Sequence, residues 1–277
     1  MMKIKLVESD ELYLATEEAL KFLNEQPIVI RQNQDRVDEV KECQMIVKVN
    51  NLDNLKISKA MPGYYNDLVE YELELVHGIK DFEMQYKRDD NGGWSYTYHE
   101  LFSKYLDNLI NELKTNKISR RAVLPVCGER SYGTDDPPCM QWMGFQITDD
   151  KLDVTSLFRS NDAVGAFTMN CFGVIELARY ISEELDIPLG TYTHIANNFH
   201  VYKRDFKKLE KYIENFSKNN QYYTFDEYKK RYEDYAKEIV EKLRKRELFL
   251  AGAENSDKIN EKYDDLLESN IVRKRFK

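Results

Sequence analysis

The segment from Phe172 to Leu185 most limits what this chain can fold into. Its apolar residues recur at helical spacing, which predicts a helix rather than a strand. These residues are Val174, Ile175, Leu177, Ala178, Ile181 and Leu185. A helix that is apolar over much of its surface belongs in the interior of a domain. The other elements must therefore be arranged around it.

Shorter periodic stretches precede and follow that helix. Apolar stripes at helical spacing predict helices over 11–24, 64–76 and 101–115, the second of them ending at Gly78. Runs rich in β-branched residues predict strands over 27–31, 42–49, 122–126 and 192–195. A hairpin is predicted between 143–147 and 152–158, with its turn at 148–151. Asp35 and Arg36 are expected in a polar loop between the first two strands.

Beyond Asp205 the composition changes abruptly to charged residues and tyrosines. Thr224 and Glu227 have the spacing of a capping box, which predicts the start of a helix. One apolar stripe continues along it through Tyr228, Tyr232, Tyr235, Ile239 and Leu243. We therefore predict a catalytic body over residues 1–205 and a helical C-terminal extension over 206–277, packed on the body or on another subunit.

The charge balance and the cysteines exclude several classes of protein. The 41 basic and 49 acidic residues give a net charge of −8, whereas general nucleic-acid binding needs a positive surface. No signal peptide is visible, and no apolar run approaches the ~20 residues needed to cross a bilayer. Four dispersed cysteines (Cys43, Cys127, Cys139, Cys171) favour reduced thiols over disulfides or a zinc site. We expect a cytoplasmic protein with no metal, no membrane contact and no nucleic-acid partner.

Chemically capable residues fall at intervals between Asp136 and Tyr202. They are Cys139, the pair Arg159 and Ser160, Asn170, and the pair His200 and Tyr202. Alone, a cysteine among Pro, Met and Trp is more often a small buried hydrophobe. Together, these groups suit a covalent enzyme acting on a nucleotide: a thiol as nucleophile, a guanidinium and a hydroxyl for phosphate, and an amide for a base edge.

In that order the segment resembles thymidylate synthase, and its archaeal-type branch in particular. Two sequence motifs are shared: Asp-Asp-Pro-Pro-Cys, ending at Cys139, and Phe-Arg-Ser-Asn-Asp over 158–162. The likeness covers 118–205, is weaker over 28–117 and is absent after about 206. It implies an α/β (α+β) fold in which helices flank a large twisted mixed sheet. It also implies a homodimer whose sheets pack back to back.

The resemblance also implies roles for individual residues. Cys139 would be the nucleophile, with Cys171 as its rival, and Tyr98 keeps its place in the catalytic site. Phosphate would be held by Arg36, Arg159 and Ser160 and, from across the dimer interface, by Arg120 and Arg121. Asn170 would read the base, His200 and Tyr202 the 3′ hydroxyl, and Asp162 the pterin. Glu70, Glu72 and Glu74 compete for a proton-handling role on the helix over 64–76. Departures from the family pattern are His99 for glycine, Asn198 for aspartate and Phe158 for glutamine.

The implied reaction is reductive methylation of dUMP to dTMP, with methylenetetrahydrofolate or a related pterin as co-substrate. An amide at Asn170 suits uracil because it can donate to O4 and accept from N3–H, whereas cytosine reverses one of those bonds. A pyrimidine nucleotide hydroxymethylase acting on dUMP or dCMP is the alternative. The usual apolar tail that closes over folate is not found, which favours that alternative. A non-catalytic nucleotide- or RNA-binding relative is the third reading, although binding alone needs no thiolate.

Overall fold

Strand pairing sets the frame of the molecule. The computed structural model describes residues 2–33, 36–60, 64–86, 96–128, 137–218, 222–252, 255–273 and 275–276. Its main sheet has the order β1-β3-β9-β7-β6-β5, with β2 added to β3 and β8 to β9. These strands are β1 (Ile4–Ser9), β2 (Ile28–Asn33), β3 (Arg36–Val49), β5 (Val123–Pro125), β6 (Met140–Thr148), β7 (Lys151–Phe158), β8 (Asn161–Asp162) and β9 (Leu189–Tyr202). The β1–β3, β7–β9 and β8–β9 pairs are parallel and the others antiparallel, so the sheet is mixed as expected.

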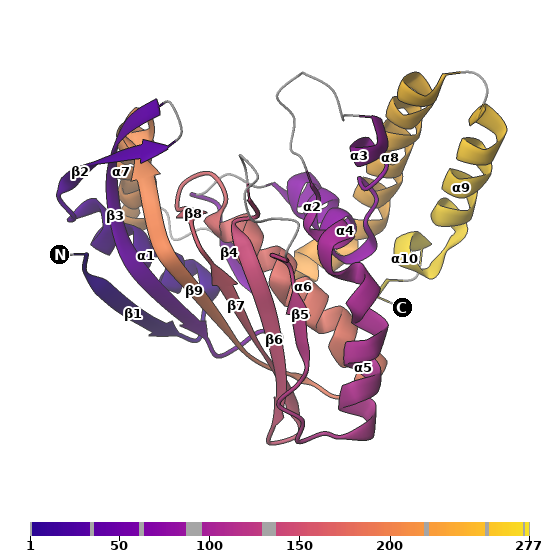
Figure 1. Cartoon of the computed structure of the whole chain (residues 1–277), viewed down its shortest axis with the longest axis horizontal. Coiled ribbons are helices and arrows are strands. Elements are labelled where there is room, and N and C mark those ends of the chain that lie inside the picture. The colour runs from indigo at the N-terminus through magenta and orange to yellow at the C-terminus, as the bar shows by residue number, and fades with distance from the viewer. Residues whose placement is uncertain are drawn as a thin grey trace.

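Helices cover one face of this sheet. They are α1 (Leu12–Asn24), α2 (Tyr65–His77), α3 (Glu83–Tyr86), α4 (Tyr98–Phe102), α5 (Leu106–Thr115), α6 (Phe167–Leu185), α7 (Phe206–Lys218), α8 (Phe225–Ala251), α9 (Ser256–Glu268) and α10 (Asn270–Arg273). Figure 1 looks onto the other face of the sheet, with α1, α7 and α6 behind it. A separate two-stranded sheet joins β4 (Lys56–Ser58) to β10 (Tyr222–Thr224).

The predicted interior helix is confirmed as α6. Its side chains are buried almost all the way round between the sheet and the outer helices α2 and α5. The helix begins at Phe167, five residues earlier than its apolar run, so Asn170 lies in its first turn. It ends where Asp186 adopts a left-handed conformation (φ 53°), and the chain then turns into β9.

Local turn chemistry explains the predicted hairpin, which is also confirmed. Thr148 pairs with Lys151 across a two-residue turn. Asp149 and Asp150 both have positive φ, at 50° and 58°. A type I′ hairpin turn needs this conformation at both positions, and aspartate tolerates it better than most residues with a side chain.

Two expectations about strands and helices need correction. Arg36 pairs with Asn33 and opens β3, so it belongs to a strand rather than to a polar loop; its side chain lies outside the described part of the chain. The helix expected over 101–115 is interrupted, because a 3₁₀ turn at Ser103–Tyr105 separates α4 from α5. The predicted strand over 192–195 is the middle of the longer β9.

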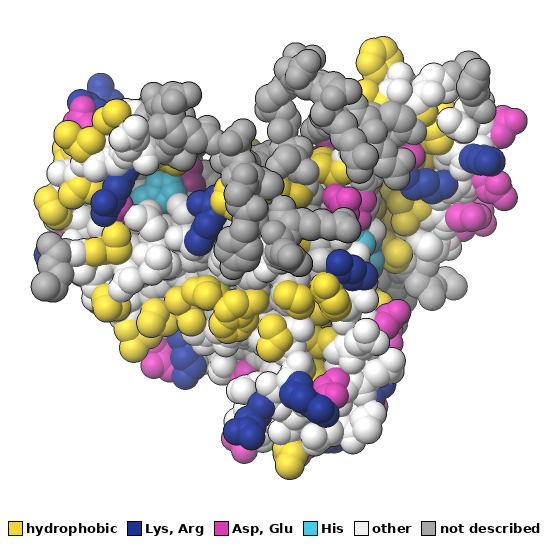
Figure 2. All heavy atoms as spheres, in the orientation of Figure 1, with side chains coloured by type: hydrophobic (Ala, Val, Ile, Leu, Met, Phe, Trp, Pro, Cys, Tyr) yellow, Lys and Arg dark blue, Asp and Glu magenta, His cyan; other side chains and the backbone are white. Residues whose placement is uncertain are grey.

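A row of apolar side chains crosses the uncovered face of the sheet. Each residue of this row is paired with the next one on the neighbouring strand, in the order Leu6, Ile46, Ile195, Leu157 and Trp142. Most of their chain neighbours point to the other face and are buried against the helices, while Lys5 and Gln141 are half-buried. Figure 2 shows the corresponding hydrophobic band across the middle of this face. We call these five residues the apolar row.

The C-terminal helices pack on the body, one of the two expected arrangements. Helix α8 lies against α2 (Figure 1), and a buried charge cluster joins the layers. Arg275 Nε donates to Glu72 Oε1 at 3.0 Å, and Arg275 Nη1 donates to Glu183 at 2.6 and 2.8 Å. Glu176 Oε2 lies 3.9 Å from Arg275 Nη2, and Tyr228 donates to Glu72. One guanidinium therefore neutralises acids from both α2 and α6.

We expect Arg275→Ala to lower the free energy of unfolding by about 3–5 kcal/mol near neutral pH, because it leaves buried carboxylates without their cation. Lys237→Ala is the matched control. Lys237 pairs with Glu233 on the exposed surface of α8 at 2.8 Å, and losing such a pair costs less than about 1 kcal/mol. Urea unfolding followed by circular dichroism measures both losses.

The loss in Arg275→Ala should shrink as the pH falls. Burial and the nearby Glu176 carboxylate raise the pKa of Glu72 to about 7, above its ordinary 4.5. The folded state therefore favours protonated Glu72, a contribution that is complete below the ordinary pKa and is lost as the pH rises through the folded one. Equal losses at about pH 5.5 and about pH 8 would contradict this account.

Candidate functional site

The ends of four strands bring the predicted site residues to one end of the sheet. Cys139 immediately precedes β6 and Arg159 immediately follows β7. The first pair of that ladder, Met140 with Phe158, therefore places them side by side, and Arg159 N–H donates to Cys139 O at 2.8 Å. In the next strands Asp162 of β8 pairs with His200 of β9. A thiol, a guanidinium, a carboxylate and an imidazole thus gather at adjacent strand ends.

Arg159 holds the backbone that presents the thiol. Its Nη2 donates to Pro137 O at 2.5 Å and its Nε to Pro138 O at 3.1 Å. The Cys139 thiol is only partly buried, so it is accessible to a substrate. Tyr98, at the start of α4, accepts the Met140 N–H at 3.4 Å. Burial raises the pKa of Tyr98 well above its ordinary value, so this phenol stays neutral beside the turn that carries Cys139.

Cys171 is a core residue rather than a second nucleophile. It is fully buried in α6, with Sγ 3.7 Å from His194 Nδ1. Burial raises the pKa of its thiol, which suppresses the reactive thiolate. Burial also lowers the pKa of His194 to about 3, so a neutral imidazole completes this interior. Phe158, at the place of the family's glutamine, stacks on His194 with ring centroids 4.8 Å apart.

The Asn170 amide is fixed from α2 by a residue that the sequence did not single out. Tyr71 donates its hydroxyl to Asn170 Oδ1 at 2.6 Å. Tyr71 follows Leu68 by three residues and precedes Leu75 by four, so helical phase puts it on a face with two buried leucines. This spacing could have indicated from the sequence that Tyr71 faces the core. It does not reveal which residue the Tyr71 hydroxyl contacts.

The three candidate glutamates of α2 are engaged elsewhere. Glu70 pairs with Lys80 at 2.7 Å and with Lys242 at 3.2 Å, and Glu74 pairs with Lys80 at 2.8 Å. Glu72 is fully buried in the cluster around Arg275. No hydrogen bond from these carboxylates to Asn170 occurs among the described residues.

The residues expected to hold a sugar lie together at the end of β9. His200 Nδ1 is 3.4 Å from Ser160 Oγ, and the His200 ring meets Tyr202 edge-on at 4.8 Å. Burial lowers the pKa of His200, which favours the neutral imidazole. Asn198, the departure from aspartate, donates to Glu42 Oε2 at 2.7 Å. This hydrogen bond links the neighbouring strands β9 and β3.

Asp162 shapes the turn that leads into α6. Its Oδ1 accepts the N–H groups of Val164 and Gly165, both at 2.9 Å. The residue is partly exposed, so its carboxylate is fixed in direction and still open to a ligand. This turn connects Asp162 to the start of α6, whose first turn carries Asn170.

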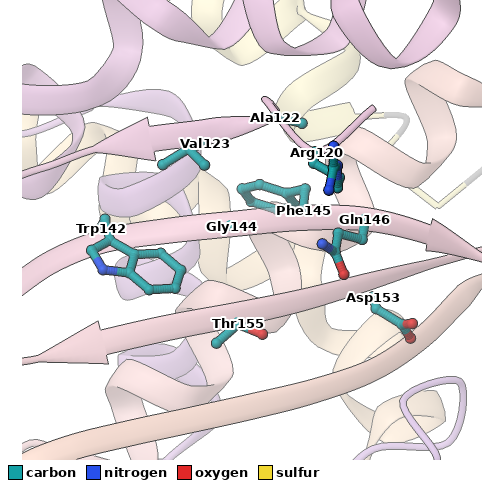
Figure 3. A pocket seen from close by; sticks show the side chains of 9 residues that line it. All are labelled: Arg120, Ala122, Val123, Trp142, Gly144, Phe145, Gln146, Asp153 and Thr155. Atoms are coloured by element: carbon teal, nitrogen blue, oxygen red, sulfur yellow. The ribbon is translucent and has the colours of Figure 1, made fainter. Parts of the chain in front are cut away.

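Arg120 and Arg121 lie away from Cys139 of the same chain. Arg120 lines a shallow hollow on the uncovered face of the sheet, with Trp142, Gln146 and Asp153 among its walls (Figure 3). Arg121 Nη2 donates to both carboxylate oxygens of Glu112, at 2.8 and 3.1 Å. Gln146 is seven residues along β6 from Cys139, a separation of roughly 23 Å at the rise of a strand. The fold therefore splits the predicted phosphate arginines into two separate groups.

Neither a metal-binding cluster nor a membrane-spanning helix occurs in the described part of the chain. Over those ranges no three His, Cys, Asp or Glu side chains are grouped to hold a metal ion. In the same part of the chain no helix combines the length and apolarity that a membrane span requires.

Known proteins agree on one family. The family model described as thymidylate synthase matches residues 71–260, across the boundary predicted at 205. A protein of Methanocaldococcus jannaschii, provisionally named a thymidylate synthase, is 31% identical over 209 residues, covering 70% of this chain and 88% of its own. One of Methanococcoides burtonii with the same provisional name is 28% identical, covering 65% of this chain and 82% of its own.

A solved structure has the same fold. Thermostable thymidylate synthase A from Bacillus subtilis superposes with a TM-score of 0.59 at 17% identity, covering 74% of this chain and 84% of its own. The expected fold class is thereby confirmed. Since the family model also spans more than half of the 277 residues, the chain belongs to the thymidylate synthase family.

Proposed function

We propose that this protein transfers a one-carbon unit to C5 of dUMP, giving dTMP through a covalent bond between Cys139 and C6. The observation that carries the proposal is the gathering of Cys139, Arg159, Ser160 and His200 at one end of the sheet, with Asn170 in the first turn of the helix that follows β8. Family membership supports the reaction class. The Arg159 guanidinium, held against the carbonyls of Pro137 and Pro138 just before Cys139, suits a nucleotide phosphate.

The covalent step makes C5 nucleophilic. The Cys139 sulfur bonds to C6, and the π electrons of the C5–C6 bond move toward C5 and O4, giving an enolate. C5 then bonds to the methylene carbon of the pterin donor, and loss of the C5 proton together with cleavage of the bond from that carbon to the pterin nitrogen leaves an exocyclic methylene and a tetrahydropterin. A hydride converts it to methyl, after which the sulfur departs and the double bond returns. Methylenetetrahydrofolate, or a related pterin, would supply both the carbon and the hydride.

The residues present fit these two substrates. Asn170 would donate to uracil O4 and accept from N3–H. Ser160 and Arg159 would hold phosphate, and His200 and Tyr202 would contact the 3′ hydroxyl. Asp162 fits a polar group of the pterin, because its turn fixes the carboxylate while leaving it partly exposed. Arg36 remains a candidate for the phosphate on resemblance alone.

A hydroxymethylase acting on the same nucleotides is the second candidate. It shares every step until water, rather than hydride, attacks the exocyclic methylene. One observation favours it. Arg275 and Phe276 are committed to contacts with α2, α6 and α8, including the Phe276 ring against Tyr232 at 5.2 Å. These contacts tie both residues into the packing of the C-terminal helices, whereas the resemblance leads one to expect an apolar segment that closes over the folate.

A homodimer through the uncovered sheet face completes the proposal. The apolar row would be buried between two back-to-back sheets. Arg120 lies on that face, far along β6 from its own Cys139. We therefore propose that Arg120 and Arg121 reach the nucleotide phosphate of the other subunit. Release of Arg121 from Glu112 would accompany this contact.

Cys139→Ala should abolish turnover while dUMP still binds, since only the nucleophile is removed. With the wild type, 5-fluoro-dUMP should form an adduct that peptide mass spectrometry maps to Cys139. Cys171→Ala is the control and should retain both turnover and adduct, because its thiol is buried. An adduct on Cys171 would refute the assignment.

Arg120→Ala and Cys139→Ala should each be inactive as homodimers, yet mixing them should restore up to a quarter of the wild-type activity per site. A hybrid dimer contains one site with both groups intact, and random exchange makes half of the dimers hybrid. Subunit exchange is verified with two different affinity tags. Complete absence of activity after exchange would show that the arginines do not act across the interface.

Mass analysis of the nucleotide product tests the reaction itself. From dUMP and methylenetetrahydrofolate we expect dTMP, with dihydrofolate appearing in equal amount because the hydride comes from the folate. A hydroxymethylated nucleotide together with tetrahydrofolate would establish the second candidate instead. If neither dUMP nor dCMP is converted with any one-carbon donor, the third hypothesis, a non-catalytic nucleotide- or RNA-binding relative, would be favoured.

A further inference from the structure

The contact between α2 and α6 places one phenol directly against the amide assigned to the base. We propose that Tyr71 is a positioning residue, which fixes the orientation of the Asn170 amide and so makes the nucleotide site select uracil over cytosine. This inference rests on the proposed function and deepens it, because it names the origin of the base preference.

The contact is built into the packing of the two helices. Tyr71 Oη lies 2.6 Å from Asn170 Oδ1. Gly173 follows Asn170 by three residues, on the same side of α6. A Cβ at Gly173 would stand 2.5 Å from Tyr71 Cε1 and 2.8 Å from Leu75 Cδ2. Only glycine at this position lets the Tyr71 ring lie across α6 and reach the amide.

The phenol acts as the donor in this bond. Burial raises the pKa of Tyr71 far above its ordinary value, so the hydroxyl keeps its hydrogen. Among the described residues, Asn170 Oδ1 is the acceptor found for that hydrogen. Rotating the amide by half a turn would bring Nδ2, itself a donor, to face the phenol. The hydroxyl hydrogen would then lose this acceptor, and a donor without a partner is unfavourable at this half-buried contact against the buried Asn170.

An anchored carbonyl leaves a defined pattern for a ligand. The two hydrogens on Asn170 Nδ2 and the second lone pair of Oδ1 remain available. Uracil presents an acceptor at O4 and a donor at N3, which this amide can meet together. Cytosine presents a donor at C4 and an acceptor at N3, which needs the rotated amide. The Tyr71 hydroxyl opposes that rotation without touching the base.

Tyr71→Phe tests the idea, because it removes the hydroxyl and keeps the ring. The matched control is Tyr65→Phe on the same helix, which removes a hydroxyl that donates to Glu227 Oε2 at 2.7 Å, outside the site. Dissociation constants and kcat/KM are measured for dUMP and dCMP with each variant. We expect the preference for dUMP over dCMP to fall about ten-fold in Tyr71→Phe and to stay unchanged in Tyr65→Phe.

Gly173→Ala provides a second route to the same result. Its methyl group displaces the Tyr71 ring while the hydroxyl is retained, so the preference should fall here too. Melting temperatures of all variants separate a loss of folding from a change in selectivity.

The outcomes distinguish this inference from the function beneath it. If the wild type prefers dUMP and the preference is unchanged in Tyr71→Phe, the inference fails while the proposed function stands. Equal weakening toward both nucleotides would mark Tyr71 as merely structural and also overturn it. A wild-type preference for dCMP overturns the account of Asn170. If the wild type binds neither nucleotide, the proposed function fails and the inference falls with it.

Discussion

Burial of α6 between two layers is the constraint on which the rest of the structure depends. One side of this helix faces β7 and β9, and the opposite sides face α2 and α5. A helix satisfies its own backbone hydrogen bonds, so it can occupy the centre of a domain where an irregular segment could not. Because the N-terminal turn of α6 lies beside the strand ends, Asn170 is carried on the most rigid element available. The position of Asn170 is therefore set by the packing of the core.

That central position also obliges the core to accommodate charge. Glu176 of α6 is fully buried, and Arg179 beside it is nearly so. Arg179 Nη2 donates to Leu52 O at 2.9 Å, and its guanidinium stacks on the Phe225 ring at 3.9 Å. Buried ions of this kind are weak evidence for stability, but removing one partner is costly. Arg275, which follows α10, therefore ties the docking of the C-terminal segment to these charges, since moving it would leave Glu72 and Glu176 without their cation.

Sequence reasoning succeeded where the physics is local and stopped where it is not. Helical periodicity revealed α6, and the paired aspartates revealed the hairpin turn, because both depend on near neighbours. Strands β1, β4 and β10 were not expected, since such short strands are defined by partners far along the chain. In the site, ordered motifs predicted the gathering of Cys139, Arg159 and His200. They did not find Tyr71 between two glutamates, because its contact with Asn170 depends on how distant elements are packed. The division at residue 205 stays a prediction.

The position of Arg275 has a consequence for how the chain is made. The acids it neutralises, Glu72 and Glu176, leave the ribosome long before it does. During synthesis α2 and α6 therefore meet with two carboxylates and no Arg275 guanidinium between them, and compaction of the nascent body is opposed until Arg275 emerges. Domains of many proteins fold from the N-terminus as they are translated. Here the interior is completed only once Arg275 has emerged, so a product that stalls before this residue would retain an unfinished core and be exposed to proteolysis.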